Sequence, residues 1–274
     1  MLLTRIAIVE APHTTDTVNT GLQLVMPNET APAHRHTAFA MRFIIEGNGG
    51  FTAVHGRRIK MQRGDVILTP SWNWHDHGKD GSGPMIWLDS LNLPSFKHFP
   101  VHFVEHYAEP RYPAEDVDSS TSPLVFPWDK MQAKLDAGEG NSWRERYLKA
   151  DGQEGKFTYF SIVSCLNFTH LHEVSKSLGC AAERLDKGTS SPAIRETSSC
   201  VYHVVSGKGY SKINDKKFEW KQGDTFCIPS WHKYQHFADN DDTVYLYRTD
   251  DQPMIKVLGF YRVEGMDVES LVSE

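Results

Sequence analysis

The sequence lacks the features that would place it in a membrane or a secretory pathway. No apolar run approaches the roughly 18 residues that a membrane-spanning helix needs. The apolar start of the chain reaches Glu10 before it forms an adequate signal-peptide core or a small-residue cleavage site. We therefore expect a cytoplasmic protein that makes no use of a membrane.

A basic patch and paired cysteines are also missing. The 29 Lys and Arg residues are outnumbered by 35 Asp and Glu residues, and the net charge of -6 offers no electrostatic footprint for nucleic acid. The four cysteines are widely spaced and form no C-x-x-C motif, at Cys165, Cys180, Cys200 and Cys227. This spacing argues against a zinc knuckle and a disulfide scaffold, so we expect buried thiols and a small-molecule partner.

What the chain does contain is a long internal repeat. Its 274 residues, 39% of them hydrophobic, suffice for two small domains. The segment RFIIEGNGG at Arg42 returns as YHVVSGKGY at Tyr202, and the Pro-Ser-Trp at Pro70 returns at Pro229, an offset of about 160 residues. Both copies break short runs rich in Val, Ile, Phe and Thr with glycine turns, which is typical of antiparallel β-structure. The sequence therefore predicts two small β-barrels in tandem.

The segment between the two copies has a different texture. It contains several prolines, and its later part predicts a helix over residues 129–150, interrupted near Gly138 and Gly140. We therefore expect three parts: an N-terminal barrel, a partly helical connector and a C-terminal barrel, at residues 1–95, 96–156 and 157–274.

Three histidines in the first copy have the spacing of a metal site. His34-Arg35-His36 falls in a predicted strand, where alternate side chains share a face, so the two imidazoles project together and Arg35 points away. His75 follows Pro70 by five residues, after a strand that can lie beside the first in a closed barrel. Three neutral imidazoles suit Fe, Zn, Cu or Ni better than Mg or Ca, and a half-open coordination sphere suits catalysis.

The H-R-H motif, the glycine turn and the later G-x5-P-x4-H together resemble the two-part metal signature of the cupin superfamily. The resemblance implies an all-β fold of two tandem cupin barrels, each a double-stranded β-helix or jelly roll, with a partly helical connector. Many cupins add a glutamate ligand shortly after H-x-H, but here that place holds Ala40 or Met41. The resemblance therefore implies a three-histidine site with no protein carboxylate, which favours an anionic chelating ligand.

Five motifs carry a closer resemblance, which covers most of both barrels: A-P-A-H-R-H-T from Ala31, R-F-I-I-E-G from Arg42, G-D-V-I-L-T-P-S-W-N-W-H-D-H-G from Gly64, W-L-D from Trp87, and L-G-F-Y-R from Leu258. This resemblance is to the gentisate 1,2-dioxygenase family of bicupins, which includes salicylate and 1-hydroxy-2-naphthoate dioxygenases. It implies an oxidoreductase of aromatic compound catabolism that incorporates both atoms of O₂.

This resemblance also implies a set of site residues. The iron(II) ligands would be His34, His36 and His75. The catalytic residues would be Arg42, His77 and Asp89, and the substrate-binding residues Gln23, Arg42 and His77. Arg42 would offer a forked guanidinium to a carboxylate. His77, with a pKa near neutrality, would hydrogen-bond the substrate hydroxyl and assist proton transfer, and Asp89 would orient a histidine.

The implied reaction opens gentisate, or a related hydroxylated aromatic carboxylate, between the carbons that bear the carboxyl and hydroxyl groups. The product would be of the maleylpyruvate type, and the partners would be the aromatic acid and O₂. The family habit implies a homo-oligomer, either a dimer or a tetramer. Only 33 residues precede His34, fewer than is usual in the family, so we expect part of the substrate enclosure to be missing or replaced.

Two other functions remain open. The chain could be a cupin that binds a metal and an aromatic acid without turnover, or a zinc or manganese cupin isomerase, although the missing glutamate disfavours the latter. The repeat maps His34, His36 and His75 onto Ile194, Glu196 and Tyr234, so we expect a degenerate metal site and a structural role for the second barrel.

Another group of histidines has the spacing of a helical zinc site: His98, His102 and His106. Pro100 interrupts this spacing, so we do not expect the three to bind zinc.

Overall fold

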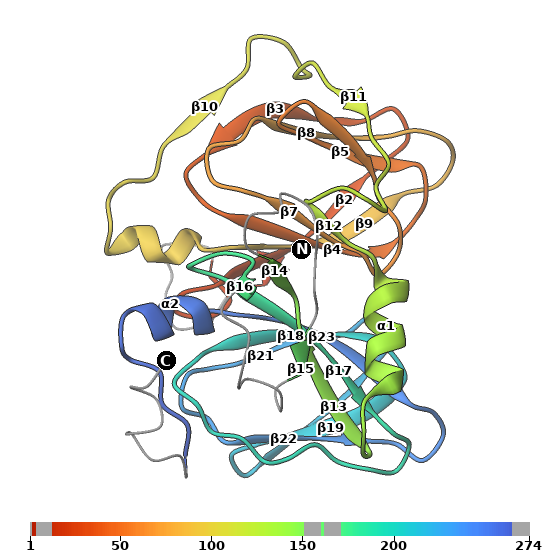
Figure 1. Cartoon of the computed structure of the whole chain (residues 1–274), viewed down its shortest axis with the longest axis vertical. Coiled ribbons are helices and arrows are strands. Elements are labelled where there is room, and N and C mark those ends of the chain that lie inside the picture. The colour runs from red at the N-terminus through yellow and green to blue at the C-terminus, as the bar shows by residue number, and fades with distance from the viewer. Residues whose placement is uncertain (1, 4–12, 151–159, 162–170, 265–274) are drawn as a thin grey trace.

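The computed structural model describes residues 2–3, 13–150, 160–161 and 171–264, and it has two barrels stacked along its long axis (Figure 1). Cys165, which was expected to be a buried thiol, lies outside the described residues. Among the described cysteines, Cys180 and Cys200 are buried and Cys227 is half-buried. No helix of the described residues has the length and apolar character needed to span a membrane.

The first barrel is formed by two six-stranded sheets that face each other. The first sheet has, in spatial order, β1 (Leu2–Leu3), β2 (Asn19–Val25), β9 (Met85–Leu91), β4 (Ala40–Glu46), β7 (Val66–Thr69) and β12 (Val125–Phe126). The second sheet has β10 (Val104–His106), β3 (Thr30–His36), β8 (His75–Lys79), β5 (Gly50–Val54), β6 (Arg57–Lys60) and β11 (Glu115–Asp116).

The second barrel repeats this order, which confirms the tandem all-β cupin fold expected from the sequence. Its main sheet has, in spatial order, β15 (Phe160–Ser161), β13 (Ser142–Arg146), β17 (Gly179–Leu185), β23 (Val244–Asp250), β18 (Cys200–Ser206) and β21 (Thr225–Ile228). The smaller sheets are β20 (Lys216–Lys221), β19 (Lys208–Ile213) and β22 (Tyr234–Ala238), and the pair β14 (Leu148–Ala150) and β16 (Leu171–Glu173). The run β17-β23-β18-β21 is the counterpart of β2-β9-β4-β7.

Alternate side chains of β4 pack into two different cores. Met41 and Phe43 point out of the first barrel into a core shared by both barrels, where the Phe43 ring stacks on Tyr247 at 4.4 Å. Arg42 and Ile44 lie on the opposite face, and Ile44 belongs to the interior core of the first barrel. The core between the barrels therefore holds in place the strand that presents Arg42 to the barrel interior.

Within the described residues, the connector contains one α-helix, α1 (Trp128–Ala137). The 3-10 helix η1 (Leu93–Lys97) follows β9, and a further α-helix, α2 (Gln252–Val257), follows β23. The predicted helix over residues 129–150 was wrong beyond Ala137. Gly138 leaves the helix with an extended backbone, and residues 142–146 form β13, which pairs with β17. Tertiary pairing there overrides local helix propensity.

Strands of the connector pair with both barrels. β10, β11 and β12 pair with strands of the first barrel, whereas β13 pairs with β17 of the second. The division expected at residues 1–95, 96–156 and 157–274 stays a prediction.

Candidate active site

Two neighbouring strands bring the three predicted histidines together. His34 and His36 project from β3, and His75 begins β8, where it lies directly opposite His34 in the antiparallel register. The ring centroid of His75 is 4.3 Å from that of His34 and 4.7 Å from that of His36. One nitrogen from each ring lies within 4.8 Å of the others, and no carboxylate joins this cluster among the described residues. The arrangement has the donor set of a three-histidine metal centre.

Backbone contacts set the tautomer of each imidazole. Each Nδ1 atom lies 2.8–2.9 Å from a carbonyl oxygen two residues away, those of Pro32, Ala38 and Asn73. Because a carbonyl only accepts hydrogen bonds, Nδ1 carries the proton and the Nε2 lone pair is left for another partner. The Nε2 atom of His75 is buried and has no hydrogen-bond partner within the described residues. A metal ion would satisfy these three nitrogens, so the residues fit a bound divalent ion.

The electrostatics of the cluster favour its neutral, metal-binding form. Burial lowers the pKa of His36 to about 4 and that of His75 to about 2, and nearby Arg42 pushes both in the same direction. An imidazole must be unprotonated at the ligating nitrogen to hold a metal, so this ring pair is ready for binding at neutral pH.

Arg42 enters the site from the facing sheet and is held by Asp89. The two residues are paired across β4 and β9, with Arg42 Nε 3.0 Å from Asp89 Oδ1. Arg42 is 3% exposed, and its Nη1 donates to Thr69 Oγ1. The other oxygen of Asp89 accepts a hydrogen bond from Trp87 Nε1 at 2.9 Å. The expectation that Asp89 orients a histidine was wrong, because the β4–β9 register gives this carboxylate a guanidinium partner instead.

His77 lies on the same face of β8 as His75, with its ring centroid 5.8 Å from that of His75 and 5.3 Å from that of Trp87. Burial lowers the pKa of His77 well below its ordinary value, and the positive charge of Arg42 adds to this effect. The expectation of a pKa near neutrality was therefore wrong, since the ring is only 2% exposed. Its Nδ1 is buried without a hydrogen-bond partner in the described part of the chain.

Gln23 lies on the same sheet as Arg42 and Asp89. It is half-buried on β2, directly opposite Trp87 of β9, and so shares the inner face of the sheet with that residue. The structure thus brings Gln23, Arg42, His77 and Asp89 to the inside of one barrel with the histidine cluster.

Sequence reasoning missed one neighbour of the cluster. β10 pairs with β3 so that His106 faces His34, and the two ring centroids are 6.2 Å apart. His98, His102 and His106 do not share a helix: η1 ends at Lys97 with His98 as its C-cap, and His106 belongs to an edge strand. Their regular spacing therefore does not reflect a shared helix.

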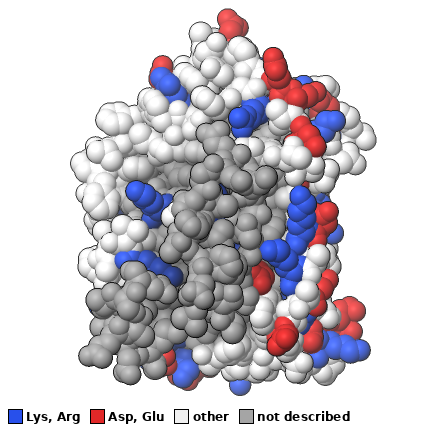
Figure 2. All heavy atoms as spheres, in the orientation of Figure 1, with Lys and Arg blue, Asp and Glu red and all other residues white. Residues whose placement is uncertain are grey.

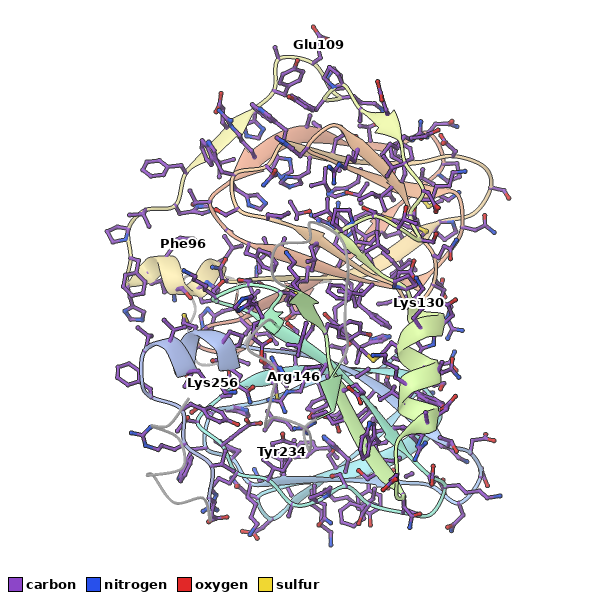
Figure 3. The ribbon with its side chains drawn as sticks, viewed as in Figure 1. Phe96, Glu109, Lys130, Arg146, Tyr234 and Lys256 are labelled. Carbon is purple, nitrogen blue, oxygen red and sulfur yellow. The ribbon has the colours of Figure 1, made fainter. Side chains whose placement is uncertain are left out.

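In the second barrel, a buried arginine binds the residues that replace two of the metal ligands. Glu196 and Tyr234 stand where the first barrel has His36 and His75, and Figure 3 labels Tyr234 within that barrel. The Arg248 guanidinium donates to Glu196 Oε1 at 2.8 Å and to Tyr234 Oη at 2.9 Å. Arg248 is 1% exposed and its Nε also pairs with Asp250 at 2.9 Å. A buried ion-pair network therefore fills this interior.

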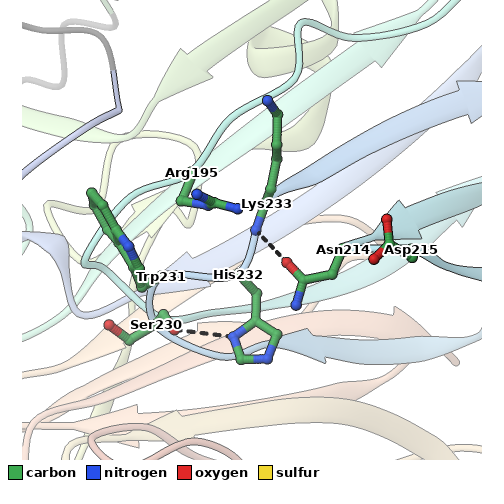
Figure 4. Close-up of a pocket in the computed structure, with 7 residues that line it drawn as sticks. All are labelled: Arg195, Asn214, Asp215, Ser230, Trp231, His232 and Lys233. Carbon is green, nitrogen blue, oxygen red and sulfur yellow. Dashed lines mark hydrogen bonds between the residues drawn. The ribbon is translucent and has the colours of Figure 1, made fainter.

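A hollow of about 550 Å³ on the second barrel has no comparable donor set (Figure 4). It is lined by Arg195, Asn214, Asp215, Ser230, Trp231, His232 and Lys233. Its two cationic side chains already have a counter-charge, since Arg195 lies 2.9 Å and Lys233 3.5 Å from carboxylate oxygens of Glu264. In the described part of the face in Figure 2, Lys and Arg side chains intermingle with Asp and Glu along the edge formed by α1.

Comparisons with known proteins agree with this site. A cupin domain model matches residues 21–91. Gentisate 1,2 dioxygenase 1 of Aquipseudomonas alcaligenes is 33% identical over 94% of this chain and 78% of its own length. The 5-aminosalicylate 1,2-dioxygenase of Comamonas sp. is 31% identical over 93% of this chain and 71% of its own length.

A solved structure extends the agreement to three dimensions. The salicylate 1,2-dioxygenase of Pseudaminobacter salicylatoxidans superposes with a TM-score of 0.80 at 26% identity, covering 96% of this chain and 79% of its own. Its adduct with gentisate gives the same TM-score. The family resemblance expected from the motifs is thereby confirmed. The chain belongs to the gentisate 1,2-dioxygenase family and is a bicupin oxidoreductase of the dioxygenase type.

Proposed function

We propose that this protein is an iron(II)-dependent ring-cleaving dioxygenase. It opens gentisate, or a related hydroxylated aromatic carboxylate, between the carbons that bear the carboxyl and hydroxyl groups, and the product is of the maleylpyruvate type. The observation that carries the proposal is the cluster of His34, His36 and His75 beside the buried Arg42. The substrates named for the family relatives support the choice of aromatic acid.

The three histidines would hold the ion through Nε2. Bound iron(II) would supply open coordination positions for the substrate oxygens and O₂, and a route for electrons between them. Neutral donors leave the double positive charge of a divalent ion uncompensated, because no carboxylate joins the cluster among the described residues. This charge favours a dianionic chelate made by a carboxylate and an adjacent phenolate.

Arg42 would orient the substrate carboxylate. Its Nε forms an ion pair with Asp89 and its Nη1 donates a hydrogen bond to Thr69, whereas Nη2 makes no hydrogen bond within the described residues. A guanidinium held at two points loses little rotational freedom when it binds an anion with the third nitrogen. Asp89 therefore acts on the substrate through Arg42.

His77 and Gln23 would complete the polar wall. The depressed pKa of His77 keeps its imidazole neutral, so one ring nitrogen can accept a hydrogen bond from the substrate while the other donates one. Gln23 would add a neutral hydrogen bond from β2. The buried position of these groups excludes water from the substrate and strengthens each interaction.

Oxygen uptake tests the proposal. Protein reconstituted anaerobically with iron(II) receives gentisate and then air, while O₂ consumption and the absorbance of the ring-opened product are followed. Stoichiometric uptake that disappears in the zinc-loaded protein is expected. Binding of metal and ligand without uptake, for gentisate, salicylate and hydroxynaphthoate alike, would instead favour a cupin that binds aromatic acids without turnover. Isomerisation by a zinc or manganese form, without O₂, would favour an isomerase.

We also propose a cytoplasmic homo-oligomer, either a dimer or a tetramer, in which residues 1–95 carry the metal centre and residues 157–274 a structural barrel with a degenerate site. Light scattering on the purified protein measures the oligomeric state.

A further inference from the structure

The edge strand β10 extends the sheet of β3 and β8 beside the metal centre. It pairs with β3 so that Val104 faces His36, Glu105 faces Arg35 and His106 faces His34. Residues directly opposite in an antiparallel pair project from the same face of the sheet. Val104 and His106 therefore share the inner face with the histidine cluster, whereas Glu105 lies on the outer face, where it forms an ion pair with Arg35.

The segment that carries β10, residues 103–113, is firmly attached to the barrel (Figure 1; Figure 3 labels Glu109 at its outer end). Backbone hydrogen bonds join Phe103 to Thr37 and both Tyr107 and Pro110 to Ala33. These contacts lie on both sides of the H-R-H motif, so the position of β10 is tied to that of the metal ligands.

A buried anchor holds the far end of the same segment. Asp76 is 1% exposed on β8, between His75 and His77 but on the opposite face. One of its oxygens lies 3.1 Å from Arg111 Nη1, and the other accepts the backbone N–H of Tyr112 at 3.1 Å. The segment that carries His106 is therefore held by Asp76, on the strand that also bears His75 and His77.

His106 itself is free to meet a ligand. Its side chain is exposed, its ring lies 6.2 Å from that of His34, and its imidazole makes no hydrogen bond within the described residues. It lies outside the group of nitrogens that could share one ion. An imidazole in this position offers one donor or one acceptor to a polar group that projects from the metal centre toward β10.

We propose that His106 is a specificity-determining residue, which hydrogen-bonds a hydroxyl or amino substituent carried by the aromatic ring in addition to the carboxylate and hydroxyl that chelate the metal. The inference rests on the proposed function, because the substrate must bind at the histidine cluster. Arg42 and Asp89 belong to the sheet of β4 and β9, whereas His106 belongs to the edge strand beyond β3. The chelating edge of the ring and its additional substituent thus meet different walls of the barrel.

Two ligands that differ by one hydroxyl test the proposal. Gentisate, 2,5-dihydroxybenzoate, has the additional group, and salicylate, 2-hydroxybenzoate, lacks it. Their dissociation constants are measured anaerobically by calorimetry on the iron(II)-loaded full chain, together with its metal content. Loss of one hydrogen bond in His106→Phe is expected to weaken gentisate binding about tenfold, with salicylate binding and metal content unchanged. His106→Gln, which keeps a donor and an acceptor, is expected to recover part of the loss.

Glu105→Gln is the matched control, because Glu105 is the next residue on the same strand but faces outward. It is expected to leave both dissociation constants unchanged. Equal weakening of both ligands by His106→Phe, no weakening of either, loss of metal in that variant, or no binding of gentisate to the unsubstituted protein would each overturn the assignment. Selective gentisate binding without O₂ uptake would instead refute the proposed reaction and leave the role of His106 standing.

Discussion

Arg42 faces Asp89 across β4 and β9, and the corresponding pair in the second barrel, Tyr202 and Arg248, carries its positive charge on the other strand. In the first barrel the arginine is held by the carboxylate on its neighbouring strand and remains available to a ligand. In the second, Arg248 turns to Glu196 at the position of a metal ligand and closes the interior. One architecture thus supports an open site and a filled one.

The triad prediction concerns metal content. His75→Ala is expected to lose bound metal and O₂ uptake together, because two imidazoles without a carboxylate hold a divalent ion far more weakly than three. Metal analysis after gel filtration measures the loss. His232→Ala, at a half-buried histidine of the second barrel, should keep full metal content and activity. An His75→Ala protein with a full complement of metal would contradict the triad.

A second prediction separates metal binding from substrate orientation. Arg42→Lys should keep the metal but lower kcat/KM by about tenfold to a hundredfold, because a lysine cannot hold Asp89 and Thr69 while binding a carboxylate. Steady-state O₂ uptake at graded substrate concentrations measures the change. An unchanged kcat/KM in a fully metallated variant would remove Arg42 from the site.

The ion-pair network of the second barrel gives a stability prediction. Arg248→Met should lower the free energy of unfolding by about 3–5 kcal/mol, because it leaves Glu196 buried without its ion-pair partner and leaves Asp250 with Arg146 alone. Urea denaturation followed by circular dichroism measures the loss. The double variant with Glu196→Gln should regain part of it, since an amide needs no counter-charge and can still bond Tyr234. Equal stabilities for the single variant and the unsubstituted chain would refute this account.

Acid stability follows from the same carboxylates. Burial alone would raise the pKa of Asp250, but Arg146 and Arg248 lower it below its ordinary value, and Arg144 does the same for Glu183. A carboxylate whose folded pKa is depressed contributes stability above its unfolded pKa and loses that contribution as pH falls. We therefore expect the free energy of unfolding to drop as pH falls below about 4. Unfolding curves from pH 7 to pH 3 test this, and a shallower decline is expected for Glu183→Gln.

The tandem fold and the histidine cluster were predictable because their signals are local. The repeat of glycine turns and apolar runs appears in the chain whatever the tertiary contacts are. The alternation of a β-strand alone puts His34 and His36 on one face. Placing His75 in the cluster required one further assumption, that its strand lies beside the first. The antiparallel pairing of β3 and β8 confirms this assumption.

Contacts between distant segments decided the rest. The partner of Asp89 depends on the pairing of β4 with β9, and the depressed pKa of His77 depends on burial, which no residue type reveals. Residues 142–146 became a strand because β17 offers them an edge. His106 reaches His34 only because β10 pairs with β3, across an interval of sequence whose histidine spacing suggested a helix. Motifs within one strand are set by backbone geometry, whereas charge pairing, burial and the walls of the site arise only when the strands assemble.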